Sequence, residues 1–142
     1  MTTISRESAR TIIAQALATG TDAGMKPLSV AVVDAGGNLI AFERGDGAPG
    51  GRFELADGKA NACIMMGIPT SAIMARAEQQ PYFVNALSVA YKGRFVPVTG
   101  GVLVTDNNGD IIGAVGVTGD ISDNDAAAAI AGIKAAGFNS IA

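Results

Sequence analysis

A hairpin-like stretch from Gly100 to Asp120, GGVLVTDNNGDIIGAVGVTGD, constrains the fold of this chain more than any other part. Two apolar runs flank Asn107-Asn108-Gly109, which is typical of a β-hairpin turn. The second run carries glycine at positions 113, 116 and 119. Glycine weakens a strand because it brings no side chain to pack, so this spacing indicates that something approaches the backbone closely. A ligand, a helix or a partner subunit would each account for it.

The hairpin leads directly into Asp120-Ile121-Ser122-Asp123, which indicates the start of a helix. Backbone N–H groups at such a junction can face an anion, so we expect a ligand site here. Ser122 with Asp125 resembles a capping box. The alternative is a tightly packed junction between sheet and helix that binds nothing.

The bulk composition predicts one domain that spans residues 1–142. The net charge of −3, with scattered Lys and Arg, argues against nucleic-acid binding. No apolar run is long enough for a membrane span, and no signal peptide is visible. We therefore expect a cytoplasmic protein. The apolar residues are mostly small, which favours close packing between subunits in a homo-oligomer.

The chain contains no histidine and a single cysteine, Cys63. The cysteine has no partner for an internal disulfide, which fits a reducing compartment. Ser-His-Asp and Cys-His chemistry are excluded, and one cysteine is too few for a structural zinc site. We therefore predict no metal, and Cys63 itself is best interpreted as a small buried hydrophobe.

Periodicity and turn residues predict alternating helices and strands. The first helix should end at Gly20 and Gly24, and the last should bury Ala126, Ala129, Ile130 and Ile133. Residues 95–98 fit either a strand or an extended segment. The other predicted elements are helices at 5–19, at 52–66 and from 69 to about 93 with an interruption at Pro81, and hairpin strands at 28–33, 39–43, 101–105 and 111–117. This order predicts an α/β (α+β) domain, with helices flanking a central antiparallel sheet of about five strands.

The two predicted hairpins resemble each other. VVDAGGNLIA at 32–41 aligns with VTDNNGDIIG at 104–113, with Val, Asp, Gly and Ile at equivalent positions. Asp34 and Asp106 are therefore best explained as turn residues, and we expect one geometry for both turns.

Several of these segments together resemble a known family. They are Asp34-Ala35-Gly36-Gly37, Arg44 with Asp46-Gly47-Ala48, Lys59-Ala60, Gly100-Gly101, and residues 113–119 followed by Asp125. In this order they are similar to the GlcG/HbpS family, also called the DUF336 or haem-degrading family, which includes the C-terminal domain of PduO-type proteins. The resemblance covers about residues 5–137.

The resemblance implies a compact α/β domain that forms dimers and often assembles further, commonly to octamers. It also implies a link to haem binding or to the catabolism of small molecules. The axial haem ligand proposed for haem-binding members is a histidine in or after the first helix, and residues 15–25 of this chain offer none. Substitute ligands would have to be Tyr82, Tyr91, Cys63 or a methionine. No cofactor is predicted, and haem stays open as an alternative.

Lys59 lies in a helical run of small and apolar residues. Drawn toward the sheet, it would lose solvation, and its amine could act as a base or nucleophile; a solvent-facing lysine is the alternative. Glu54 and Asp120 are the candidate proton carriers, and Arg44 suits a carboxylate. Alternatively, the negative charge of Glu54 could simply stabilise the N-terminus of its helix, and Arg44 could pair with a neighbouring acidic residue. Polar and backbone contacts to a ligand are expected from Thr99, Gly100, Gly101, Gly116, Thr118 and Gly119.

Three functions follow from these patterns. The first is an oligomeric small-molecule-binding protein or small catabolic enzyme, acting as an isomerase, hydratase or lyase on a small carboxylate or carbonyl compound. The second is a haem-binding or haem-handling protein, disfavoured by the absence of histidine. The third is a structural assembly module. Whether the chain is an enzyme is left open at this point.

Overall fold

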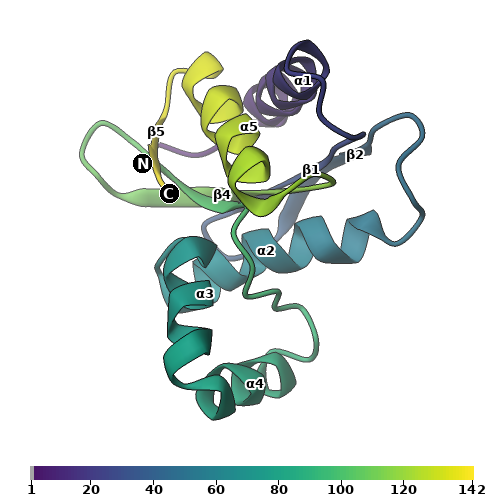
Figure 1. Cartoon of the computed structure of the whole chain (residues 1–142). Coiled ribbons are helices and arrows are strands. Elements are labelled where there is room, and N and C mark those ends of the chain that lie inside the picture. Colours follow the sequence, from purple (N-terminus) through teal and green to yellow (C-terminus); the bar gives the residue numbers. More distant parts are fainter. Residues whose placement is uncertain (1) are drawn as a thin grey trace.

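The computed structural model describes residues 2–142 as a single α+β domain with the predicted antiparallel sheet of five strands (Figure 1). The strand order is β2-β1-β4-β3-β5. Its helices are α1 (Arg6–Asp22), α2 (Arg52–Met66), α3 (Thr70–Gln79), α4 (Pro81–Ala90) and α5 (Ser122–Ala135). Its strands are β1 (Ser29–Asp34), β2 (Leu39–Arg44), β3 (Gly101–Thr105), β4 (Ile111–Thr118) and β5 (Asn139–Ile141).

Helices cover both faces of the sheet (Figure 1). Because side chains alternate along a strand, Val30 of β1 and Val117 of β4 pack against α1 and α5 in the larger core. Val33 and Ala114 point the other way and meet Ala60 and Cys63 of α2. Helices α3 and α4 lie on the far side of α2, where a third apolar cluster joins them to it.

Of the three glycines that indicated a close approach, Gly116 lies under α2, whereas Gly113 lies against Ile4 and the Val33 carbonyl oxygen and Gly119 against the Pro27 carbonyl oxygen. Ala31, Gly116 and Gly101 lie opposite one another on neighbouring strands and form a row without large side chains. A Cβ atom placed on Gly116 would lie 1.9 Å from the carbonyl oxygen of Ala56, so the α2 backbone rests directly on this row. As a result, eight consecutive residues of α2, positions 56–63, are buried.

The two hairpin turns share one geometry, as the internal similarity predicted. In the first, Asp34 Oδ1 accepts hydrogen bonds from the backbone N–H groups of Gly36 and Asn38. In the second, Asp106 Oδ1 accepts from those of Asn108 and Asp110. Each turn also contains a glycine with positive φ, at 37 and 109.

Helix α1 corrects one predicted boundary. Gly20 does not end it, because this glycine packs inside the helix against Leu28, and α1 continues to Asp22. The predicted cap at Ser5 is present, with its side chain accepting from the Ser8 N–H.

The C-terminal half adds one strand and corrects two further predictions. Residues 95–98 form no strand, which leaves the extended segment of the two alternatives, and the fifth strand is β5 at the end of the chain, which was not predicted. Ser122 and Asp125 form no capping box, because Ile121 occupies the N-cap position without a side-chain hydrogen bond and Asp125 accepts from the Asp120 N–H. Ile130 is 36% exposed, whereas Ala128 and Gly132 are buried.

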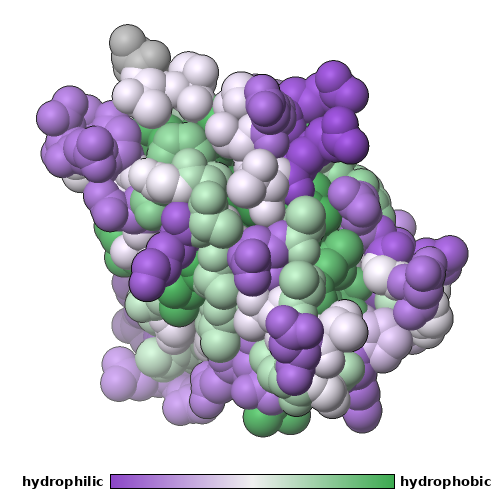
Figure 2. All heavy atoms as spheres, turned by 90° about the horizontal axis from the view of Figure 1, so that it is seen from above, coloured by the Kyte–Doolittle hydropathy of each residue, from purple (hydrophilic) through white to green (hydrophobic). Residues whose placement is uncertain are grey.

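The surface over α1 and α5 mixes residue types. Seen from above, hydrophobic and hydrophilic residues lie interspersed on this side (Figure 2). Within residues 2–142 no helix combines the length and apolar character that a membrane crossing requires.

Candidate functional site

Lys59 is turned toward the sheet and buried, with 4% of its surface exposed. Its ammonium nitrogen donates to the carbonyl oxygen of Val117 at 2.9 Å and lies 3.3 Å from Asp125 Oδ2. The other oxygen of Asp125 accepts from the backbone N–H of Asp120 at 2.9 Å. A buried ion pair therefore joins α2 to the start of α5, 66 residues later in the chain.

Burial acts on both members of this pair. Desolvation lowers the pKa of Lys59, and it outweighs the attraction of Asp125, which raises that pKa. The nearby Arg52 guanidinium lowers the Lys59 pKa further. Desolvation likewise raises the pKa of Asp125, against the lowering effect of its hydrogen bond from Asp120 and of the Lys59 charge. The protein interior therefore stabilises the charged forms of Lys59 and Asp125 less than water would.

Gly100 provides space for the Lys59 side chain, and Gly119 lets the end of β4 pass close to the backbone of Pro27. Their φ angles of +131° and +144° lie in a region that L side chains rarely adopt. A Cβ atom on Gly100 would lie 2.8 Å from the Lys59 Nζ atom. One on Gly119 would lie 2.3 Å from the carbonyl oxygen of Pro27. The resemblance segments around Lys59, Gly100, Gly119 and Asp125 therefore converge on one place.

A polar row crosses the same end of the sheet. Arg44 of β2, Ser29 of β1 and Thr118 of β4 lie opposite one another, so their side chains share the face that carries α2. Arg52, at the start of α2, approaches this row with its Nη1 atom 3.5 Å from Thr118 Oγ1. Arg44 Nη1 donates to the Ala48 carbonyl oxygen of the glycine-rich loop at 3.4 Å.

Two buried polar atoms at this row have no protein partner. They are the Ser29 hydroxyl oxygen and the Arg52 Nε atom. Buried polar groups in native proteins nearly always have a hydrogen-bond partner, so the two atoms beside Thr118 leave a hydrogen-bonding capacity that the protein itself does not satisfy. The guanidinium is a donor only, so the group that meets it must be an acceptor.

The remaining predicted residues are distributed as follows. Gly101 and Gly116 lie beneath α2, where its backbone fills the space above them. The Thr99 hydroxyl is 3.5 Å from the Met74 sulfur, and Asp120 accepts from the Asn124 side chain. Glu54 is exposed and lines a different hollow, beside Asp57 and Arg94.

Sequence reasoning missed Arg52 and Ser29. Neither belongs to a recognisable motif, and only the strand register places Ser29 beside Thr118. It also missed the bidentate pair between Arg94 and Asp57, with N–O distances of 2.7 and 3.0 Å, which holds the segment after α4 to α2. Hydrogen bonding to Asp57 raises the pKa of Arg94.

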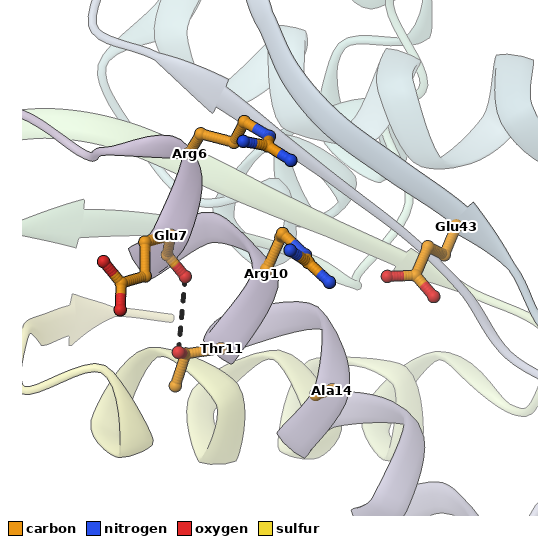
Figure 3. Close-up of a pocket in the computed structure, with 6 residues that line it drawn as sticks. All are labelled: Arg6, Glu7, Arg10, Thr11, Ala14 and Glu43. Carbon is orange, nitrogen blue, oxygen red and sulfur yellow. Dashed lines mark hydrogen bonds between the residues drawn. The ribbon is translucent and has the colours of Figure 1, made fainter.

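A large surface hollow lies elsewhere. It measures about 650 Å³ and is lined by residues of α1 and by Glu43 of β2. Arg10 and Glu43 reach toward one another across it (Figure 3). Its charged side chains are exposed to water, and it contains none of the predicted site residues. We therefore place the candidate site at the polar row, where the motif residues and the unpartnered atoms coincide.

Of the candidate haem ligands, Cys63 is poorly placed. Cys63 is fully buried, and burial raises the pKa of its thiol to about 12, whereas a ligating cysteine must be a thiolate. Tyr82 is 71% exposed on α4. Among residues 2–142 no three His, Cys, Asp or Glu side chains come together in a group that could hold a metal ion.

Comparisons with known proteins agree on one family. The family model described as "Haem degrading protein HbpS-like" matches residues 4–134. A crystal structure of a double mutant of HbpS from Streptomyces reticuli is 30% identical, with a TM-score of 0.80, and the match covers 94% of this chain and 87% of that one. No curated protein matches the chain.

Two other solved structures share the fold. The protein ORFY of Klebsiella pneumoniae, described as DUF336, is 26% identical with a TM-score of 0.85, covering 96% of this chain and 92% of that one. A PduOC complex with haem is 23% identical with a TM-score of 0.86, covering 99% of this chain and 100% of that one.

Proposed function

This chain belongs to the HbpS-like family, and we propose that it binds a small carboxylate or carbonyl compound at the polar row formed by Arg44, Ser29, Thr118 and Arg52. One observation carries the proposal. The buried Arg52 Nε and Ser29 Oγ atoms lack partners beside Thr118, at the place where the motif residues converge.

The chemistry of these groups defines the ligand class. A guanidinium presents donors in a fixed fork that matches a carboxylate. The Ser29 and Thr118 hydroxyls can each donate to a second oxygen, such as a carbonyl or hydroxyl oxygen of the same molecule. A compact compound with a carboxylate and one adjacent oxygen function would satisfy both orphan atoms.

Lys59 is the residue best suited to assist chemistry in this site. Its amine is desolvated and held by Asp125, and desolvation lowers its pKa, so the neutral amine that acts as base or nucleophile is easier to form than in a solvent-exposed lysine. Its burial implies that a ligand would meet it only by displacing part of the contact with the Val117 carbonyl. We therefore propose binding as the primary activity and an isomerase, hydratase or lyase reaction as its extension.

Calorimetric titration with three probes tests the proposal. Pyruvate carries both functions, acetate only the carboxylate and acetone only the carbonyl. We expect pyruvate to bind best and Arg52→Met to weaken that binding by at least about tenfold, because a charged acceptor loses its donors. Arg10→Met, which removes an exposed arginine of α1, is the matched control. Equal pyruvate affinity in the wild type and Arg52→Met would refute the site.

Haem binding is the second candidate function, favoured by the family description and by the haem complex of PduOC. The residues of this chain do not fit a haem held by a buried axial ligand, because the chain has no histidine and its only cysteine is sealed in the core. A haemin titration followed by the Soret band decides the point. A saturable shift that is lost in Tyr82→Phe or Tyr91→Phe would support haem binding with an unusual ligand, and no saturable shift would exclude it.

A further inference from the structure

A second hollow lies where the first hairpin turn, the end of α2 and the segment after α4 meet. It measures about 370 Å³, within the range of about 300–1,000 Å³ that is usual for small-molecule sites. Asn61, Lys92 and Arg94 are its polar lining residues, and Met65 and Tyr91 contribute apolar surface. The hollow therefore combines apolar walls with a few polar groups, as ligand sites do.

Asn61 contributes a buried acceptor that the protein leaves unused. The residue is 4% exposed. Its side-chain N–H donates to the Arg94 carbonyl oxygen at 2.7 Å, which sets the orientation of the amide. The amide oxygen, Oδ1, has no hydrogen-bond partner within residues 2–142. Because a buried acceptor without a donor costs free energy, an N–H or O–H group of a ligand would be stabilised there.

Gly37 and Met65 lie against this oxygen. A Cβ atom on Gly37 would lie 2.6 Å from Asn61 Oδ1 and 3.5 Å from the terminal methyl group of Met65. The glycine of the first turn thus leaves space beside the acceptor that any larger residue would fill. Met65 is 36% exposed, and its unbranched side chain is flexible, so it can turn aside and open the acceptor to the hollow.

Positive charge borders the same hollow. Lys92 is exposed and belongs to neither of the two ion pairs found among the described residues. Arg94 uses its Nε and Nη2 atoms on Asp57 and on the Gly37 carbonyl oxygen, which leaves Nη1 for another acceptor. Glu54 and Asp57 line the neighbouring hollow and not this one. An anionic group here would therefore meet cationic side chains and no carboxylate in the lining.

We propose that this hollow binds an aromatic or other apolar carboxylate that also carries an N–H or O–H donor. The carboxylate faces Lys92 and Arg94, the donor reaches Asn61 Oδ1, and the apolar body lies against Met65 and Tyr91. The Tyr91 ring is stacked on Phe95, with 5.6 Å between the ring centroids, so this wall is held in place.

Calorimetric titration with the three aminobenzoates, benzoate and aniline tests the ligand class. The three isomers sample different separations between the amine and the carboxylate. At least one of them should bind at least about tenfold more tightly than benzoate, which lacks the donor, and than aniline, which lacks the carboxylate. If no aminobenzoate binds more tightly than both partial probes, the proposal is wrong.

Lys92→Gly separates the charge from folding. Lys92 is the one non-glycine residue within 2–142 with a positive φ, at +57°, and glycine adopts this conformation without strain. The variant should melt no lower than the wild type, yet bind the preferred aminobenzoate at least about threefold more weakly, because an exposed charge is lost. Lys134→Gln, which removes an exposed charge of α5, is the control. Unchanged affinity in Lys92→Gly would overturn the placement of the carboxylate.

Methyl NMR and one further variant locate the bound molecule. At saturation the methyl signal of Met65 should shift, whereas that of Met74 on α3 should not. Arg52→Met should bind the aminobenzoate like the wild type, because Arg52 lies nine residues before Asn61, about 14 Å away along α2. Failure of the polar-row proposal would thus leave this one intact. An unchanged Met65 signal at saturation, or loss of binding in Arg52→Met, would overturn the second site.

Discussion

Replacing Lys59 with methionine should lower the free energy of unfolding, because the buried negative charge of Asp125 would lose the positive charge that neutralises it. Methionine keeps most of the apolar stem but removes the ammonium group, which leaves Asp125, 1% exposed, without its ion-pair partner. Breaking a buried pair from one side typically costs about 3–5 kcal/mol of the free energy of unfolding. Asp125 would retain only its hydrogen bond from the Asp120 N–H.

A second substitution separates the charge from the lost contacts. In Lys59→Met with Asp125→Asn, the amide oxygen can still accept from the Asp120 N–H, and no charge remains buried. The Val117 carbonyl still lacks the donor that Lys59 supplied, which costs about 1–3 kcal/mol. We therefore expect the double variant to be about 2 kcal/mol more stable than Lys59→Met alone.

The single variant should also acquire a pH dependence of known sign. Burial already raises the Asp125 pKa above its ordinary value of 3.8, and loss of Lys59 removes an influence that lowered it. Between the unfolded and folded pKa values the folded state binds the extra proton, so stability falls as pH rises through the folded pKa. The slope is at most about 1.4 kcal/mol per pH unit for one proton, and it should vanish in the double variant.

Urea denaturation from pH 5 to pH 8 measures all three proteins. The reasoning requires that Lys59→Met lose stability toward pH 8 relative to the double variant. If the two variants had equal free energies of unfolding at every pH, Asp125 would carry no buried charge and the ion pair would not be the feature described here.

Three further predictions concern other parts of the fold. Gly116→Ala should lower the unfolding free energy by about 3 kcal/mol, because its Cβ meets the Ala56 carbonyl, whereas Gly50→Ala, in open space, should change it by less than about 1 kcal/mol in thermal melts. With its thiol pKa at about 12 and no exposed surface, Cys63 should resist alkylation by iodoacetamide at pH 8 until urea unfolds the chain. Asp34→Ala should lower the melting temperature, because the first turn loses the acceptor for two backbone N–H groups; an unchanged temperature would show that the turn holds without it.

Much of the fold followed from local signals in the sequence. The hairpin turns and the bounds of α2 were predictable because glycine, aspartate and proline determine the backbone conformation at their own and adjacent positions. The end of α1 was predicted wrongly at Gly20, because the small residue is required there by a tertiary contact with Leu28 that no local pattern shows. Strand β5 was not predicted, because three residues that pair only with the edge of β3 are too few to show a periodic pattern.

The candidate site was predictable only in part, for a related reason. Lys59 stood out because a charged residue lies among small ones, but its partner Asp125 comes 66 residues later and was assigned to a helix cap. Ser29 looks like the polar start of a strand, and only the register places it beside Thr118. Pairings across the sheet are set by the whole topology, so no local pattern could reveal them.

The glycine row and the buried lysine are two consequences of one packing arrangement. Because Gly116 and Gly101 let the α2 backbone rest on the sheet, Lys59 has no room to reach solvent past its own helix. Its chain must run along Gly100 to the end of β4, where the Val117 carbonyl and Asp125 are the available partners. Because both charged side chains are buried, with 5% and 2% of their surface exposed, this arrangement costs solvation free energy that an apolar pair would not. A charge kept at such a cost, beside unpartnered Ser29 and Arg52 atoms, is better explained by a ligand at this end of the sheet than by stability alone.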